Sequence, residues 1–129
     1  MSKGQIDTAY SPKLLLGLEA LWREQIFVDT TLVFGPYEEI GPYEVKVHRA
    51  VLAAASQYFK SMFAGSLKES WCHERIEIHE VNPTVVENLI EYSYTGKIDI
   101  NQDNVLVLLQ TADLLQFDSV SERCFSFKT

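Results

Sequence analysis

Residues 47–70 of the chain read VHRAVLAAASQYFKSMFAGSLKES, and the prediction of the fold starts from them. The segment begins with a His-Arg pair directly after a strand-like run, Tyr43 to Val47, and continues into a short alanine-rich helix, Ala50 to Ala55. Ser56 then interrupts the apolar run, and a serine side chain is a good acceptor for the free amides at the start of a second helix. Two helices this short cannot bury themselves, so we expect the rest of the chain to cover one of their faces.

The second helix carries four large side chains within six residues, namely Tyr58, Phe59, Met62 and Phe63. Spacings of three and four place Phe59, Met62 and Phe63 on one face, whereas Tyr58 lies on a different side from Met62. This pattern predicts a helix that packs on a core, and we expect at least Phe59 and Phe63 to be partly buried. It leaves room for other side chains of the helix to be presented at the surface.

The totals describe one ordinary globular domain. The 129 residues, 47% of them hydrophobic and 22% charged, suffice for a single domain with its own core. A net charge of −7 argues against nucleic-acid binding, which requires a basic surface. Cys72 and Cys124 do not make a disulfide framework, and we expect Cys124 to be buried and Cys72 to lie in a loop. The apolar runs are too short for a membrane span, so the sequence predicts a soluble, intracellular protein.

The first helix is more apolar than a surface helix needs to be. It is predicted from Ser11 to Gln25, with Ser11 as its cap and Pro12 in its first turn. Its apolar side chains form two neighbouring stripes, Leu14, Leu18 and Leu21, and beside them Leu15, Trp22 and Ile26. This arc is wider than a helix requires to sit on a small domain. It predicts either a deep groove in the same chain or contact with a second chain.

The other elements are short and follow no regular β-α-β alternation, so the fold class is α+β, a small sheet with a cluster of helices. We expect residues 1–10 to be flexible and residues 11–129 to form the domain. The predicted elements are a strand Thr30–Phe34, a long turn Gly35–Glu44, a strand from Arg75 to Val81, a helix that begins with Asn82-Pro83 and ends before Gly96, a short strand Lys97–Ile100, a helix capped by Asp103, and a last helix with a Ser119–Glu122 capping box.

The sequence shows little sign of chemistry. His48, His73, His79 and Cys72 are the obvious metal-ligand candidates, and their number and spacing match no zinc pattern. The chain contains no nucleophile-elbow, phosphate-binding or dinucleotide-binding fingerprint, and nothing places a base beside a nucleophile. We therefore expect no metal, no cofactor and no enzymatic activity.

The segment VHRAVLAAASQYFKSMF closely resembles the core signature of the BTB/POZ domain. VDTTLVF before it, and RIEIHEV, IEYSYTGKIDI and NVLVLLQTADLLQFDSVSERC after it, occur in the order expected of that family. The resemblance implies a small, mainly antiparallel sheet with short helices, and a homodimer in whose two-fold interface the N-terminal helix packs. It assigns this dimer interface to Leu14, Leu15, Leu18, Leu21, Trp22, Asp29 and Arg49. In the family the matching Asp and Arg form a buried charged pocket; two separate surface charges are the alternative.

Leu67-Lys68-Glu69 resembles the apolar-x-Glu motif by which kelch-like and related BTB proteins bind cullin-3, and it lies where the family has it. The resemblance assigns the cullin-3 surface to Tyr58, Phe59, Met62, Phe63, Leu67 and Glu69. It implies a non-catalytic adaptor module of a cullin-3 ubiquitin ligase in the cytoplasm or nucleus, with substrate bound by regions outside this chain. The alternatives are the BTB module of a zinc-finger transcription repressor that binds corepressor peptides, and a purely self-association domain.

Overall fold

The computed structural model describes residues 4–37, 41–65, 74–79 and 81–128. These residues form an α+β domain, as predicted from the sequence. Its elements are, in chain order, α1 (Tyr10–Arg23), β1 (Thr30–Tyr37), β2 (Gly41–Val47), α2 (Arg49–Ala55), α3 (Gln57–Gly65), β3 (Glu74–Ile78), α4 (Pro83–Thr95), α5 (Val105–Leu114) and α6 (Asp118–Lys128).

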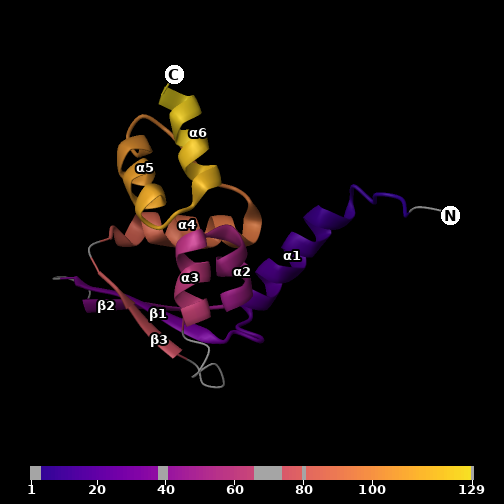
Figure 1. Cartoon of the computed structure of the whole chain (residues 1–129), viewed down its shortest axis with the longest axis horizontal. Coiled ribbons are helices and arrows are strands. Elements are labelled where there is room, and N and C mark those ends of the chain that lie inside the picture. Colours follow the sequence, from indigo (N-terminus) through magenta and orange to yellow (C-terminus); the bar gives the residue numbers. More distant parts are fainter. Residues whose placement is uncertain (1–3, 38–40, 66–73, 80, 129) are drawn as a thin grey trace.

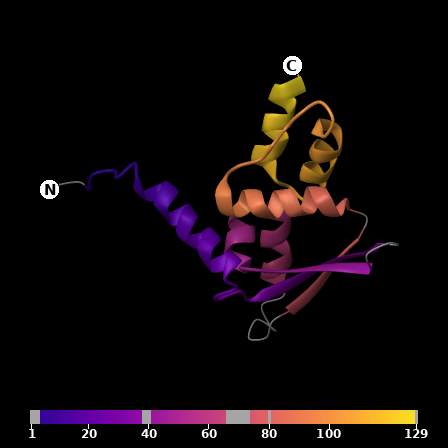
Figure 2. The same ribbon diagram turned by 180° about the vertical axis from the view of Figure 1, so that it is seen from behind.

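The domain is layered (Figure 1). The sheet lies at one side, α2 and α3 pack over it, and α4 crosses at the far end of these two helices. The helices α5 and α6 lie side by side and stand on α4, on the side away from the sheet. Seen from behind, in Figure 2, α1 extends outward from the body and ends in the N-terminal segment.

The three strands of the sheet occur in the order β2–β1–β3. The central strand pairs antiparallel with β2 and parallel with β3, so that Leu32 lies between Val45 and Ile76. The sheet is therefore mixed, whereas the sequence predicts a mainly antiparallel one. Leu32 and Phe34 on the inward face of β1 are fully buried, which places the sheet side of the core here.

The outward face of the sheet is charged. Arg75 on β3 donates hydrogen bonds to both carboxylate oxygens of Glu44 on β2, at 3.1 and 2.9 Å, and so spans the central strand. These hydrogen bonds, together with the charge of Arg75, lower the pKa of Glu44. Along β3, Glu77 is exposed and Ile78 is buried, which confirms the predicted alternation.

The prediction that Gly35–Glu44 forms one long turn is wrong for most of its length, because β1 continues to Tyr37 and β2 begins soon after it. The strand register shifts just before Tyr37, and Gly35 at that point has a φ of 103°. Glycine adopts this conformation readily, and it is common at a β-bulge. A bulge also tolerates Pro36, which has no N–H to donate. The Gly-Pro pair therefore bends the hairpin without ending the strand.

The core lies between the sheet and the helices, and the C-terminal helices add a second part to it. Val86 and Leu89 on α4 are almost fully buried. Cys124 on α6 is fully buried, as predicted, and its burial, reinforced by the Asp113 carboxylate, raises the pKa of the thiol. The buried residues of this core cluster are Leu32, Phe34, Val47, Leu52, Phe59, Phe63, Ile78, Val81, Val85, Val86, Leu89, Ile90, Tyr94, Val105, Leu108, Ala112, Leu115, Phe117, Val120 and Cys124.

Two of the predicted helix caps are confirmed. Ser56 Oγ accepts a hydrogen bond from the N–H of Phe59 at 3.1 Å and donates one to the carbonyl of Leu115 at 2.6 Å. Asn82 Oδ1 accepts from the N–H of Val85 at 3.1 Å. The buried Ser56 hydroxyl thus starts α3 and also ties the α2–α3 junction to the end of α5.

Three other predicted caps are wrong, and at two of them a neighbouring side chain accepts the hydrogen bonds instead. The first helix begins at Tyr10, and Asp7 rather than Ser11 accepts the free N–H of the preceding residue, at 3.0 Å. Before α5, Asn101 Oδ1 accepts two backbone N–H groups, at 2.8 and 3.0 Å, in place of the predicted Asp103. The last helix begins at Asp118, one residue before the predicted Ser119. Short polar side chains compete for such positions through local turns.

The predicted strand Lys97–Ile100 is also wrong for the part of the chain that the structure describes. Gly96 ends α4 with a φ of 73°, and the segment after it runs irregularly, with Ile98 and Ile100 packed against the core. A strand needs a neighbour to satisfy its backbone hydrogen bonds. None of the strands β1, β2 and β3 lies beside this segment.

Candidate protein-interaction surfaces

Helix α1 is attached to the domain by its C-terminal half. Leu18 and Trp22 pack against the core, and the Trp22 ring stacks on Tyr94 of α4 with 4.6 Å between the ring centroids and 5° between the planes. Towards the N-terminus the helix is exposed, and Leu14 keeps 47% of its surface accessible. This half projects from the body in Figure 1. One chain therefore covers only part of the wide apolar arc.

Charged groups surround the attached end of α1. The Arg23 guanidinium lies 4.5 Å from the centroid of the Trp22 ring. It is 3.4 Å from the Glu19 carboxylate and 3.6 Å from the Glu91 carboxylate on α4. Exposed ion pairs of this kind stabilise little individually. The stack of Arg23, Trp22 and Tyr94 nevertheless fixes how α1 sits against α4.

A buried hydrogen-bond hub lies directly beneath this stack. The Tyr94 hydroxyl accepts a hydrogen bond from the backbone N–H of His48 at 2.9 Å and lies 2.7 Å from His48 Nδ1. His48 Nε2 is 2.8 Å from the carbonyl oxygen of Ile26 in the loop after α1. A carbonyl only accepts, so Nε2 carries a proton and donates it. The hub therefore joins α4, the start of α2 and the end of α1.

The hydroxyl of Tyr94 is held in its neutral form. Burial raises the pKa of Tyr94 to about 12; the nearby Asp29 carboxylate acts in the same direction, and the hydrogen bond from His48 opposes both. Sequence reasoning identified the His-Arg pair and missed Tyr94. His48 and Tyr94 are 46 positions apart, and no rule of local sequence spacing connects them.

Asp29 and Arg49, assigned by resemblance to the dimer interface, do meet. Asp29 Oδ1 accepts the backbone N–H of Arg49 at 2.8 Å, at the start of α2, and Asp29 Oδ2 lies 3.4 Å from Arg49 Nε. The side chains of Arg49 and Asp29 remain 21% and 43% exposed in a single chain. One chain therefore leaves this pair only partly buried.

Helix α3 separates its large side chains into a buried and a surface set. Phe59 and Phe63 belong to the core, as expected, and Phe59 packs edge-on against Phe117 with 6.2 Å between ring centroids. Tyr58 and Met62 are both half-buried. They are four residues apart on α3 and therefore share one flank, so the expectation that Tyr58 lies on a different side from Met62 is wrong. The remaining residues assigned to the cullin-3 surface, Leu67 and Glu69, lie outside the described residues.

An apolar groove of about 390 Å³ runs between α1 and α2. Leucines of α1 form one wall, and small side chains of α2 form the other, so that a helix ridge could lie in it. The residues that line it include Leu15, Leu18, Ala50, Val51, Ala54 and Ala55.

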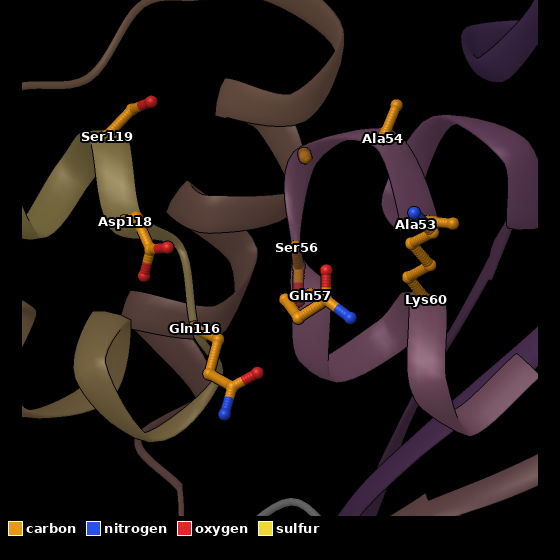
Figure 3. Close-up of a pocket in the computed structure, with 9 residues that line it drawn as sticks. Ala53, Ala54, Ser56, Gln57, Lys60, Gln116, Asp118 and Ser119 are labelled. Carbon is orange, nitrogen blue, oxygen red and sulfur yellow. The ribbon is translucent and has the colours of Figure 1, made fainter.

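A second, polar cleft of about 460 Å³ separates the α2–α3 corner from the α5–α6 corner. In Figure 3, Ser56 and Gln57 on one side face Gln116 and Asp118 on the other. Gln116 has a φ of 56°, which bends the chain sharply between α5 and α6. The cleft adjoins the N-terminal end of α3, where Gln57 and Lys60 line it.

The C-terminal helices also carry exposed apolar side chains that the sequence reasoning did not single out. Leu106 and Leu114 on α5, and Phe125 and Phe127 on α6, are all exposed. Their signal in the sequence is weak, because a helix hairpin with both faces apolar looks the same as one that is fully buried.

Within the described residues, no three histidine, cysteine or acidic side chains come together in a group that could hold a metal ion. His48 is engaged on both ring nitrogens, and His79 is exposed after β3. The candidates Cys72 and His73 lie outside the described part of the chain. None of the described helices combines the length and the apolar character needed to cross a bilayer.

Comparison with known proteins agrees with this architecture. Residues 18–129 match the BTB/POZ domain family. The chain is 46% identical over 121 residues to Kelch-like protein 21 of Homo sapiens and 40% identical over 123 residues to Kelch-like protein 9 of Mus musculus. In both cases the match covers 94% of this chain and 19% of the relative, so the chain spans about a fifth of their length.

Two solved structures are similar over nearly the whole chain. The BTB domain of human Gigaxonin has a TM-score of 0.81 at 25% identity, with 98% of each chain covered. The BTB domain of zebrafish PATZ1 has a TM-score of 0.78 at 29% identity, with 98% of this chain and 97% of that one covered. With the matched sequence family and the α+β architecture, these likenesses show that the chain belongs to the BTB/POZ domain family, with kelch-like proteins among its sequence relatives.

Proposed function

We propose that this domain forms a homodimer and recruits cullin-3, and that it thereby serves as the adaptor module of a ubiquitin ligase in the cytoplasm or nucleus. The substrate would be bound by regions outside this chain. The observation that carries the proposal is the division of α3 into a core side and a surface side. The similarity of the chain's sequence to kelch-like proteins supports the same function.

The dimer is supported by the incomplete burial of α1. The same helix offers exposed leucines, such as Leu14, and borders an apolar groove lined by Leu15 and Leu18. A surface that carries both a ridge and a matching groove can pair with a copy of itself across a two-fold axis. The half-exposed Asp29–Arg49 pair would then be covered by the second copy.

The cullin-3 surface is supported by the geometry of α3. Phe59 and Phe63 anchor the helix in the core, so Tyr58 and Met62 are held at a fixed position on its surface. The chain continues from the end of α3 towards Leu67 and Glu69, which match the apolar-x-Glu motif. Interfaces concentrate their energy in a few such anchors. The side chains of Tyr58, Met62, Leu67 and Glu69 would form a surface separate from the dimer interface.

The test is titration calorimetry of the cullin-3 N-terminal domain against the unmodified chain and two variants, Leu67→Ala and Glu69→Ala. Each variant is expected to lose affinity by roughly 30-fold or more, since interface anchors cost about 2 kcal/mol when truncated. The melting temperature and the dimer affinity should not change, because these residues are proposed to contact only the partner.

Matched controls are Ile6→Ala in the exposed N-terminal segment and Glu77→Ala on the outward face of the sheet. Both are expected to bind cullin-3 like the unmodified chain. Tight binding that survives both the Leu67 and the Glu69 substitution would show that another surface is responsible. If the intact domain does not bind at all, the adaptor function is refuted, and corepressor binding or self-association alone becomes the better reading.

A further inference from the structure

The loop between α1 and β1 holds two residues in a conformation that side chains rarely adopt. Gln25 has a φ of 59° and Phe27 a φ of 65°. Residues other than glycine are strained in this left-handed region of backbone conformation, and a bulky aromatic residue is uncommon there. Such strain persists only where the surrounding structure imposes it, and it gathers at functional positions.

Hydrogen bonds from three neighbouring elements impose this conformation. Gln25 Nε2 donates to the carbonyl of Trp22 at 2.8 Å and to that of Lys46 on β2 at 3.3 Å. The N–H of Ile26 donates to the carbonyl of Leu21 at 2.8 Å, and the Ile26 carbonyl is bound by His48. The loop is therefore clamped to the end of α1, to β2 and to the start of α2.

The clamped loop presents an aromatic side chain to solvent. Phe27 is 79% exposed, and its neighbour Ile26 is 40% exposed. For one chain alone, Phe27 at this position costs stability. A glycine would fit the backbone without strain and would expose no apolar surface. A strained, rigid and exposed aromatic residue is the expected design of an interface anchor, since little freedom remains to be lost on binding.

A groove that could accept an aromatic side chain lies at the opposite end of α1. A groove of about 380 Å³ separates the N-terminal half of this helix from the end of α4. Leu15 and Leu16 of α1 and Tyr94 of α4 form the apolar part of its wall. Ser11, Pro12, Glu19, Thr95 and Lys97 complete its lining.

Two-fold pairing of α1 would bring the anchor and the groove together. Gly17 and Ala20 are exposed and are the smallest side chains in the middle of the helix, and no atom lies within 4 Å of a Cβ built on Gly17. Two copies can therefore approach most closely there. For antiparallel helices with an axis midway between these residues, Arg23 at the end of one helix lies level with Leu14 of the other, each about 7 Å from the axis at 1.5 Å per residue. The loop that carries Phe27 follows directly after this point, next to the N-terminal half of the other copy's helix.

We propose that in the homodimer Phe27 of each copy inserts into the groove at the N-terminal end of α1 of the other copy. The inference rests on the homodimer proposed above and adds a residue that neither the sequence pattern nor the family resemblance assigned. The contact occurs twice, because a two-fold interface is isologous. The occupant of the groove is thus a second copy of this chain.

The first test measures the dimer dissociation constant by sedimentation at a series of protein concentrations. Phe27→Ala is expected to weaken the dimer by at least about 30-fold, the loss typical of an interface anchor. Phe125→Ala is the matched control, because that phenylalanine on α6 is 58% exposed and lies outside the proposed interface; its dissociation constant should stay within about threefold of the unmodified value. Phe27→Gly should weaken the dimer as much as Phe27→Ala.

Phe27→Gly also separates an interface role from damage to the loop. Glycine relieves the strain at a φ of 65°, so hydrogen-exchange protection of the monomer, measured at high dilution, should not decrease in this variant. A loss of protection together with a weaker dimer would mean that the loop had been disrupted, and would overturn the assignment of Phe27 as an anchor.

The second test identifies the receptor. In a Cys72→Ser background, the pair Phe27→Cys and Ser11→Cys is treated with a short bis-maleimide. A covalent dimer is expected for this pair, whereas the pair Phe27→Cys and Phe125→Cys should give none. Single-cysteine variants correct for linkage of identical residues.

The outcomes separate this inference from the function on which it rests. A monomeric unmodified chain at micromolar concentration would refute the homodimer itself, and the inference with it. A stable dimer that tolerates Phe27→Ala, or that fails to cross-link the Phe27 and Ser11 positions, would overturn the inference alone and leave the homodimer standing.

Discussion

Replacing Tyr94 with phenylalanine removes one oxygen from the hub that seats α1, and the structure predicts a large effect. The hydroxyl accepts the His48 N–H at 2.9 Å and is the hydrogen-bond partner of His48 Nδ1 at 2.7 Å. Tyr94→Phe leaves two buried polar groups without partners, at roughly 1–3 kcal/mol each. We expect a loss of about 2 kcal/mol or more, which for a domain of this size lowers the melting temperature by roughly 8 °C.

The pH dependence of this difference provides a sharper check. The pKa of Tyr94 is raised to about 12 in the fold, whereas an unfolded tyrosine titrates near 10. The folded state therefore holds the proton more tightly, and its contribution to stability is complete below pH 10 and lost as the pH rises through 12. The variant has no such group. The stability gap between the two proteins should shrink by about 1.4 kcal/mol between pH 9 and pH 11.

The assay is chemical unfolding followed by circular dichroism at one fixed protein concentration, because dimerisation makes the apparent stability depend on concentration. Tyr92→Phe, a half-buried tyrosine on the same helix, is the control and should change stability by less than about 0.5 kcal/mol. A Tyr94→Phe variant as stable as the parent at pH 8 would refute the hydrogen-bond assignment. A gap that stays constant from pH 9 to 11 would refute the burial that raises the pKa of Tyr94.

The remaining predictions concern the Asp29–Arg49 pair and the anchor of α3. Asp29→Ala should cost about 1 kcal/mol in a monomer through the lost acceptor of the Arg49 N–H, and a double-mutant cycle should give a coupling below about 1 kcal/mol because both side chains are partly exposed. At concentrations where the dimer forms, the coupling should rise above about 2 kcal/mol; equal coupling in both regimes would show that the second copy does not cover the pair. Phe59→Ala should cost about 3–5 kcal/mol in thermal unfolding, since Phe59 is buried against Phe63 and Phe117, and a cost below about 1 kcal/mol would place it outside the core.

Much of the architecture follows from short-range patterns in the sequence. The helical period from Val85 to Ile90 and the Asn82-Pro83 start predict α4, and Ser56 predicts the junction of α2 and α3. Such features depend on a few neighbouring residues and on one or two hydrogen bonds. They survive in the fold because the tertiary contacts agree with them. The pairing of Asp29 with Arg49 was predicted in another way, from the resemblance of both segments to a known family.

Other features were decided by packing alone. The segment Lys97–Ile100 has the composition of a strand, but a strand forms only where another strand lies beside it, and the chain places none of its described strands there. Gly35 reads as the start of a turn, yet the pairing of β1 with β2 continues the strand through a bulge to Tyr37.

The parts of the interaction surfaces that the sequence did not reveal are the long-range ones. Whether a leucine of α1 faces the core or solvent depends on the position of Trp22 over Tyr94, and that position depends on a hydrogen bond between residues 46 positions apart. The left-handed conformation of Phe27 likewise comes from hydrogen bonds to other elements and from no local preference. Local sequence therefore determined which helices and strands this chain can form, whereas tertiary contacts decided which of their faces remain open to a partner, because burial is a property of what lies opposite each side chain.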